Sequence, residues 1–250
     1  MSLLVAAASM LGLAPVLAPM GGLHAAELRV LAGGSLRSVL SELGPQFERA
    51  SGHKLTIHFD TTPNLIKLAT SGDPFDMGVF PIDVLKNEAA NARFRPGVEF
   101  VRVGYGVAVR EGAAKPDIST VDAFKKTLLD AKSITFLPAS AGGAYILKVF
   151  DRLGIDQAMK AKTVAQEQPT GIVPALVRGD AELAVFLNNV LTAPGVEIVG
   201  PFPAELQHEL VFPAAIAADA KEPAAAMAFI DFLTSPAAAS IIKAKGMTPA

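Results

Sequence analysis

The strongest constraint on the fold is an alternation of short apolar runs with longer segments of helical periodicity, which begins at residue 27 and continues to the end of the chain. Residues 28–32 read as a buried strand, and apolar side chains recur at helical spacing over residues 36–47. The same pattern predicts further strands at residues 55–59, 75–80, 133–137, 162–165, 182–187 and 210–216, and helices at 121–131, 145–153, 223–233 and 236–245. Strands separated by helices of this length predict an α/β fold with mostly parallel sheets and helices on both faces.

Two α/β blocks, followed by a tail that resumes the pattern, predict two lobes, the first of them discontinuous. We expect lobe 1 to comprise residues 27–103 and 209–250, and lobe 2 to comprise residues 104–208. The crossing segments are then residues 101–109 and 199–211, which are β-rich and contain glycine or proline, as a hinge can. A chain of 250 residues is long enough to give each lobe its own core.

Residues 1–26 predict a secretory signal peptide. No charged side chain occurs before residue 24, and Ala25 and Ala26 precede the first predicted strand at Glu27. The alternative is a buried N-terminal helix, but Pro15 and Pro19 would interrupt it. We therefore expect export to the periplasm with cleavage at Ala25 or Ala26.

Composition excludes several classes of function. The net charge of -2, with 18% charged residues and no run of like charges, argues against a nucleic-acid partner. The chain has no cysteine, which removes disulfides and thiolate sites, and its four histidines show no metal-ligand spacing. No nucleophile elbow or phosphate-loop motif occurs. We expect no metal, no cofactor and no catalytic residue, and a monomeric protein.

Four predicted strand-to-helix turns are small and rich in hydroxyl groups. Each opens a helix, so each offers unpaired backbone N–H groups and the positive end of a helix dipole. Several such turns converging on one point would bind an anion. The alternative is that each hydroxyl only caps its own helix, as Thr62 would cap a helix that begins at Pro63. The turns are Gly34-Ser35, Thr61-Thr62, Ser140 to Gly143 and Pro169-Thr170-Gly171, two from each expected lobe.

Several segments resemble the periplasmic molybdate-binding proteins. Residues 32–36 and 59–65 look like the first two ligand loops of that family, and residues 73–76, 181–185 and 211–214 are similar to its later strands. The resemblance extends over nearly all of the chain after residue 26. It implies a two-lobed periplasmic binding protein fold, and a protein that delivers a small anion to the membrane subunits of an ABC-type importer.

Carried over by the resemblance, the oxyanion contacts of the family fall on Ser35, Thr62, Gly142 and Pro169. Ser35 and Thr62 keep a hydroxyl, and Gly142 supplies a backbone N–H. Pro169 has no N–H to donate, so Thr170 or Gly171 would have to replace it. At position 187 the family has a tyrosine, where this chain has Leu187, which offers no hydroxyl.

Two further side chains indicate a different ligand. Arg37 follows the Ser35 loop, and a guanidinium can grip a carboxylate with two parallel hydrogen bonds, unless Arg37 is simply solvated. Asn188, directly after Leu187, can offer its amide. Leu187 adds an apolar wall that suits the hydrocarbon body of an organic acid. We therefore expect a small organic carboxylate to outcompete an oxyanion of the molybdate type.

An enzyme on the same scaffold is the competing interpretation. Aconitate isomerases resemble the molybdate-binding family, and such an enzyme needs a general base beside its carboxylate-binding cleft. Among the predicted loops the only acids are Asp60 and Glu167, and no histidine is present. The sequence therefore favours binding over catalysis, and it does not separate transport from signalling.

Overall fold

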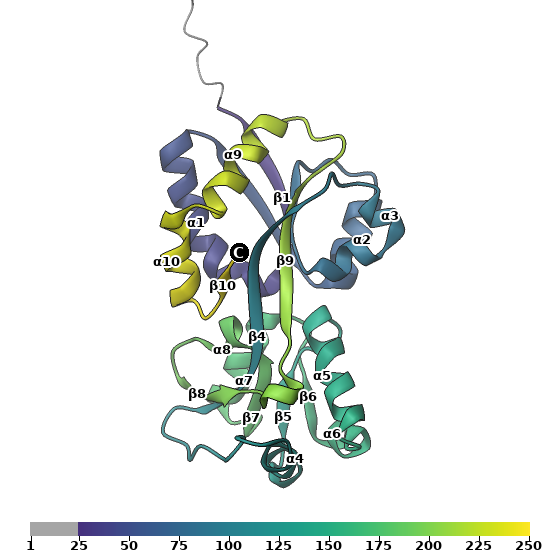
Figure 1. Cartoon of the computed structure of the whole chain (residues 1–250), viewed down its shortest axis with the longest axis vertical. Helices are drawn as coiled ribbons and strands as arrows, with labels where there is room; N and C mark the ends of the chain where they lie inside the picture. Colours follow the sequence, from purple (N-terminus) through teal and green to yellow (C-terminus); the bar gives the residue numbers. More distant parts are fainter. Residues whose placement is uncertain (1–24) are drawn as a thin grey trace, which may run out of the picture.

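The computed structural model describes residues 25–250, and the predicted signal peptide lies outside these residues except for Ala25 and Ala26. Figure 1 shows two lobes, one above the other, joined by long strands near the middle. The upper lobe contains β1 (Glu27–Gly33), η1 (Gly34–Leu36), α1 (Arg37–Ser51), β2 (Lys54–Asp60), α2 (Thr62–Thr70), β3 (Met77–Val79), η2 (Ile82–Lys86), α3 (Glu88–Asn91), α9 (Pro223–Leu233), α10 (Pro236–Ala244) and β10 (Thr248–Pro249).

The lower lobe is formed by the middle of the chain. Its helices flank a short sheet, with α5 and α6 on one side and α7 and α8 on the other, while α4 lies at the lower end (Figure 1). The elements are α4 (Val121–Asp130), β5 (Ile134–Phe136), α5 (Ala141–Arg152), α6 (Asp156–Lys162), β6 (Thr163–Ala165), η3 (Pro169–Gly171), α7 (Ile172–Arg178), β7 (Leu183–Leu187), α8 (Asn188–Leu191), β8 (Val196–Pro201) and η4 (Ala204–Leu206). The predicted α/β fold class is confirmed.

Two long strands connect the lobes. The path of hydrogen-bonded strands runs β2-β1-β3-β9-β4-β7-β5-β6, in which β4 is Val98–Arg110 and β9 is Glu209–Ile216. β1 pairs in parallel with β2 and β3, and β5 pairs in parallel with β6 and β7. β4 pairs antiparallel with β9 as far as Gly104 and with β7 from Tyr105 onward. The sheet is therefore parallel within each lobe and antiparallel where the chain crosses.

Local sequence signals explain the ends of several elements. Gly52 follows α1 with φ of +77°, and Gly154 follows α5 with φ of +65°, a backbone region that favours glycine. The prediction that Thr62 caps α2 is wrong. Thr61 occupies the N-cap, and its side chain makes no capping bond. The hydroxyl of Thr62 instead makes a contact with the other lobe.

One large core cluster extends through both lobes, from Leu28 and Phe47 in the upper lobe to Phe136 and Phe150 in the lower one. A smaller cluster packs α2, η2 and α3 against the opposite side of β1, with Phe75, Phe80 and Phe94 at its centre. The crossing strand β4 belongs to the larger cluster over most of its length. The strand therefore contributes side chains to the cores of both lobes.

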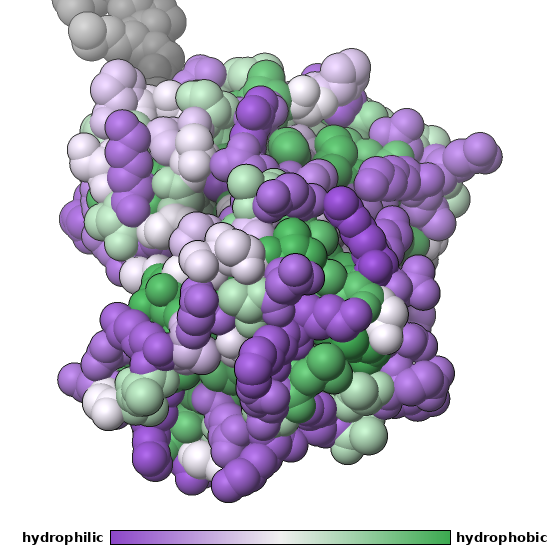
Figure 2. Space-filling view, turned by 60° about the horizontal axis from the view of Figure 1, so that its bottom comes forward, coloured by the Kyte–Doolittle hydropathy of each residue, from purple (hydrophilic) through white to green (hydrophobic). Residues whose placement is uncertain are grey.

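The surface carries few large apolar side chains. In Figure 2, with the lower lobe turned toward the viewer, hydrophilic side chains dominate and apolar ones lie between them. The exposed large apolar residues come from six different elements: Val98, Leu129, Leu147, Val177, Ile198 and Met227. Within residues 25–250 no single helix could span a membrane; α9 and α10 reach that hydropathy only as a pair, bent by 61°.

Candidate ligand-binding cleft

The predicted loops meet where the two lobes face each other, and together they line one cavity, which we call the inner pocket. Its cavity volume is about 20 Å³. That is room for about one water molecule. Its lining residues are Gly33, Gly34, Ser35, Asp60, Thr61, Thr62, Pro81, Leu137, Ser140, Ala141, Gly142, Pro169, Phe186, Leu187 and Leu210.

Three hydrogen bonds between the lobes keep the inner pocket small. The hydroxyl of Thr62 accepts from the backbone N–H of Ala141 at 3.2 Å. The Asn189 amide donates to the Ser35 carbonyl at 2.6 Å. A longer contact of 3.4 Å joins the Gln168 amide to the Asp60 carboxylate. The structure is therefore closed over the site, and a larger ligand requires the lobes to part.

Gly34 brings the upper wall into contact with the lower lobe. A Cβ at this position would lie 3.3 Å from the ring of Pro169 and 3.4 Å from the carbonyl oxygen of Asp60, so a side chain has little room. Pro169 is buried at this contact. Gly34 and Pro169 line both the inner pocket and a second cavity, which we call the outer recess. The contact between these two residues separates the two cavities.

The N-terminus of α5 forms the lower wall. Ser140 is its N-cap: the hydroxyl accepts from the N–H of Gly143 and donates to the carbonyl of Leu137, each at 2.9 Å. The N–H of Gly142, in the first turn of the same helix, has no acceptor within residues 25–250. The N–H of Gly142 therefore has no partner among the described residues, while the hydroxyl of Ser140 already makes two hydrogen bonds.

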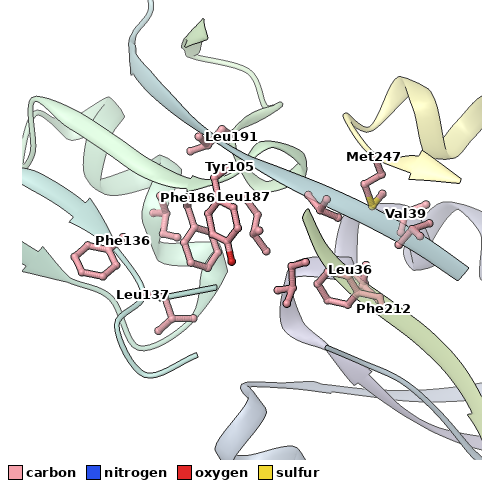
Figure 3. Packing of buried hydrophobic residues seen from close by; sticks show 14 of the residues in the cluster. Leu36, Val39, Tyr105, Phe136, Leu137, Phe186, Leu187, Leu191, Phe212 and Met247 are labelled. Carbon is pink, nitrogen blue, oxygen red and sulfur yellow. The ribbon is translucent and has the colours of Figure 1, made fainter. Parts of the chain in front are cut away.

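Much of the remaining lining of the inner pocket is apolar. Pro81, Leu137, Phe186, Leu187 and Leu210 line it, and Figure 3 shows Phe186 and Leu187 close together at the end of β7. No lysine, arginine or histidine is among the lining residues of the inner pocket. An anion at this site would meet both N–H and O–H donors and hydrocarbon.

Asp60 is the carboxylate that lines the inner pocket. Burial raises its pKa, but hydrogen bonds from the Asn64 side chain, the Thr61 N–H, His58 and Gln168 together outweigh burial, and the pKa of Asp60 lies below its ordinary value. The bonds from Thr61 and Asn64 measure 2.7 and 2.8 Å and reach the same carboxylate oxygen. Asp60 therefore stays ionised and fixes the start of α2.

Five predicted site residues lie outside the inner pocket. Arg37 is exposed, and its guanidinium carbon lies 4.3 Å from the centre of the Phe59 ring. Arg37 and Thr170 line the outer recess beyond the Gly34–Pro169 contact. The others have structural surroundings. A Cβ at Gly143 would lie 1.9 Å from the Leu137 carbonyl oxygen, one at Gly171 would lie 2.4 Å from the Gln166 amide oxygen, and Asn188 packs beneath Gly106.

Comparison with known proteins identifies the family. Residues 28–248 match the sequence model of the bacterial extracellular solute-binding proteins. The chain belongs to this family. A relative named aconitate isomerase, from Pseudomonas sp, is 33% identical over 233 residues, which cover 89% of this chain and 87% of that protein. The molybdate-binding protein ModA of Azotobacter vinelandii is 26% identical over 234 residues, with 89% and 90% covered.

A solved structure supports the fold. The periplasmic molybdate-binding protein of Azotobacter vinelandii superposes with a TM-score of 0.72 at 21% identity, over 88% of this chain and 98% of that one. The resemblance to molybdate-binding proteins inferred from short segments is thus confirmed over the whole length of the fold. For a solute-binding protein, a closed cleft lined by loops of both lobes is the arrangement that encloses a ligand.

Proposed function

We propose that this protein captures a small organic carboxylate in the cleft between its lobes and delivers it to an ABC-type importer. The observation that carries the proposal is the mixed lining of the inner pocket. The hydroxyl of Thr62 and the N–H of Gly142 provide donors, and apolar side chains, Leu187 among them, lie directly beside them. Donors at a helix N-terminus suit an anionic group, and the apolar wall suits a hydrocarbon body.

A bare tetrahedral oxyanion fits this pocket less well. Its oxygens need donors on every side, because none of them gains from contact with hydrocarbon. Pro169, which lines the pocket, has no N–H, and Leu187 has no polar group. The proposed ligand is therefore a di- or tricarboxylate rather than an oxyanion of the molybdate type.

The proposed location and movement follow from the family and the strand pairing. We infer that the protein works in the periplasm as a monomer, after cleavage of its signal peptide at Ala25 or Ala26. We also infer that the lobes comprise residues 27–103 with 209–250, and residues 104–208. The change of strand partner between Gly104 and Tyr105 supports a hinge at that boundary.

A second candidate is the isomerisation of a small tricarboxylate such as aconitate. The relative at 33% identity favours it, and Asp60 places one carboxylate at the inner pocket. In such a reaction a base takes a proton from a carbon beside a carboxylate, the double bond shifts, and a proton returns at another carbon. Asp60 is a weak base for this step, because its pKa is low and its oxygens already accept several hydrogen bonds.

One experiment separates these functions. We expect the thermal unfolding midpoint to rise with small di- and tricarboxylates more than with molybdate or sulfate, since a ligand at a hundred times its Kd adds about 2.7 kcal/mol of stability. Proton NMR of cis- and trans-aconitate incubated with the protein in D₂O then reports chemistry. Binding without conversion or deuterium uptake supports the solute-binding role. Conversion that Asp60→Asn abolishes would establish the isomerase, and stabilisation by molybdate alone would refute the carboxylate proposal.

A further inference from the structure

The hydroxyl of Tyr105 is buried and has no hydrogen-bond partner. Tyr105 is 0% exposed and is one of the largest fully buried side chains of the protein. No donor or acceptor among residues 25–250 pairs with its hydroxyl. A buried polar group without a partner destabilises the folded protein, and such groups are rare in native structures. This hydroxyl therefore calls for a partner that belongs to the working state of the protein.

Tyr105 does not itself line the inner pocket, but it lies beside a residue that does. It is directly opposite Leu187 in the antiparallel pairing of β4 with β7. Side chains directly opposite each other in such a pair lie on the same face of the sheet. Leu187 lines the inner pocket. Figure 3 shows the Tyr105 ring beside Phe186 and Leu187, with its hydroxyl at the end that points away from β4.

The ring cannot turn toward another protein partner. The side-chain amide of Gln207 accepts from the N–H of Tyr105 and donates to its carbonyl, each at 2.9 Å, which fixes the backbone. The rings of Tyr145 and Phe202 pack at 4.9 and 5.6 Å from the Tyr105 ring. The hydroxyl of Tyr145 is already used, since it donates to the Leu206 carbonyl at 2.7 Å. With no partner left among the described residues, a ligand in the cleft beside Leu187 can supply one.

The chemistry of the orphan group selects an anion. The other buried side-chain atoms without a partner in the described chain are the amide oxygens of Asn188 and Asn189, which can only accept. The Tyr105 hydroxyl can donate. Burial, with smaller contributions from the charge of Asp83 and from Tyr145, raises the pKa of Tyr105 well above its ordinary value. The hydroxyl therefore keeps its proton, and remains a donor, throughout the physiological pH range.

We infer that Tyr105 is a specificity residue that donates a hydrogen bond from its hydroxyl to a carboxylate oxygen of the bound ligand. The inference rests on the proposed function, and it assigns a ligand contact to the crossing strand in addition to the four loops. A ligand that spans the distance from the α5 N-terminus to Tyr105 carries a second oxygen-bearing group. This contact favours di- and tricarboxylates over compact anions.

The test compares two tyrosines that differ in one respect. Tyr105→Phe removes a hydroxyl without a protein partner, and Tyr145→Phe removes one with a partner. Titration calorimetry with trans-aconitate, citrate and molybdate measures affinity, and thermal unfolding without ligand measures stability. We expect Tyr105→Phe to weaken carboxylate binding about ten-fold or more, with an unfolding midpoint equal to or above that of the wild type. Tyr145→Phe should lower the midpoint and change Kd by less than about two-fold.

Each result has one reading. If the wild type binds a carboxylate and Tyr105→Phe binds it equally well, the inference is wrong while the proposed function stands. A lower unfolding midpoint for ligand-free Tyr105→Phe would mean that the hydroxyl has a partner within the protein, and would also refute the inference. If the wild type binds none of the three anions, the proposed function fails and the inference fails with it.

Discussion

The hydroxyl of Thr62 in the upper lobe accepts a hydrogen bond from the backbone N–H of Ala141 in the lower lobe, at 3.2 Å. The two residues are 79 positions apart in sequence, and each opens a helix, α2 and α5. One contact thus joins two of the loops that face the inner pocket. It shows that the groups predicted to bind an anion also hold the lobes together.

This relationship predicts the effect of removing the hydroxyl. Thr62→Val keeps the shape of the side chain but leaves the Ala141 N–H without an acceptor and the ligand without a donor. We expect the Kd for the preferred carboxylate to rise about ten-fold by calorimetry. Thr62→Ser is the matched control and should remain within about three-fold of the wild type. Equal affinity of the valine variant and the wild type would contradict a ligand role for Thr62.

Asn189 predicts a change in shape. Its amide donates to the Ser35 carbonyl at 2.6 Å and joins α8 to the first loop. Asn189→Ala removes this interlobe bond, which is worth on the order of 1 kcal/mol. We expect the radius of gyration of the ligand-free protein to increase in small-angle X-ray scattering. Asn64→Ala, which breaks a 2.8 Å bond to Asp60 within the upper lobe, is the control and should leave the radius unchanged. If the radius of gyration increases equally in both variants, the bond from Asn189 does not hold the lobes together.

Most of the element order could be predicted from the sequence, because strand and helix periods are local properties. The convergence of Ser35, Thr62 and Gly142 could also be predicted, since the carboxyl ends of parallel strands meet at one edge. The partner of Asn189 is 154 residues away, and nothing local marks that pair. Tyr105 lies in a valine-rich run that indicates only a strand. Its orphan hydroxyl results from a pairing of β4 with β7 that depends on the whole topology.

Two sequence interpretations needed tertiary information. Thr62 looks like a cap because a hydroxyl before Pro63 is typical of a helix start, yet Thr61 holds that place and Thr62 contacts the other lobe. Arg37 looks like a pocket residue because it follows Ser35 closely. The first turn of the helix carries it outward instead, onto the Phe59 ring. In both cases the side-chain direction, not the position in sequence, decides the contact.

Asp60 predicts a pH dependence of stability. Its pKa in the folded protein lies below the ordinary value of 3.8, so the ionised form contributes stability that is present above that value and is lost as the pH falls through the folded pKa. We expect the free energy of unfolding of the wild type to fall more steeply below about pH 4 than that of Asp60→Asn. Urea unfolding near pH 7 and at about pH 3 measures both. Parallel pH profiles would show that the bonds to Asp60 contribute no net stability.

Ala26 predicts where a mature chain begins. Its N–H donates to His53 at 3.1 Å, its carbonyl accepts from the N–H of Lys54 at 2.8 Å, and its side chain is 4% exposed. These contacts make Ala26 part of the fold. If the predicted signal peptide is removed, we expect cleavage between Ala25 and Ala26. Mass spectrometry of the exported protein measures this, and a chain that begins at Glu27 or later would contradict it.

Arg37 now carries a prediction about rate. The protein has a net charge of -2, so its overall field repels an anion, and Arg37 places a positive charge in the outer recess. A charge at the entrance of a binding site changes the association rate more than it changes the stability of the bound complex. We expect Arg37→Gln to slow association with the preferred carboxylate several-fold at low ionic strength, and the effect to shrink as salt screens the charge.

The control for Arg37 lies on the same helix. Arg49→Gln changes the net charge by the same amount, but Arg49 is in the last turn of α1. We expect it to leave the association rate close to that of the wild type. Stopped-flow measurements give the association and dissociation rates separately. A change confined to the association rate identifies electrostatic steering of the ligand. Arg37→Gln could instead speed dissociation at every salt concentration. That result would mean that, in the wild type, the guanidinium of Arg37 leaves Phe59 and binds the carboxylate of the ligand. That grip is the role that the sequence pattern predicts, and it requires the outer recess and the inner pocket to join when the Gly34–Pro169 contact opens.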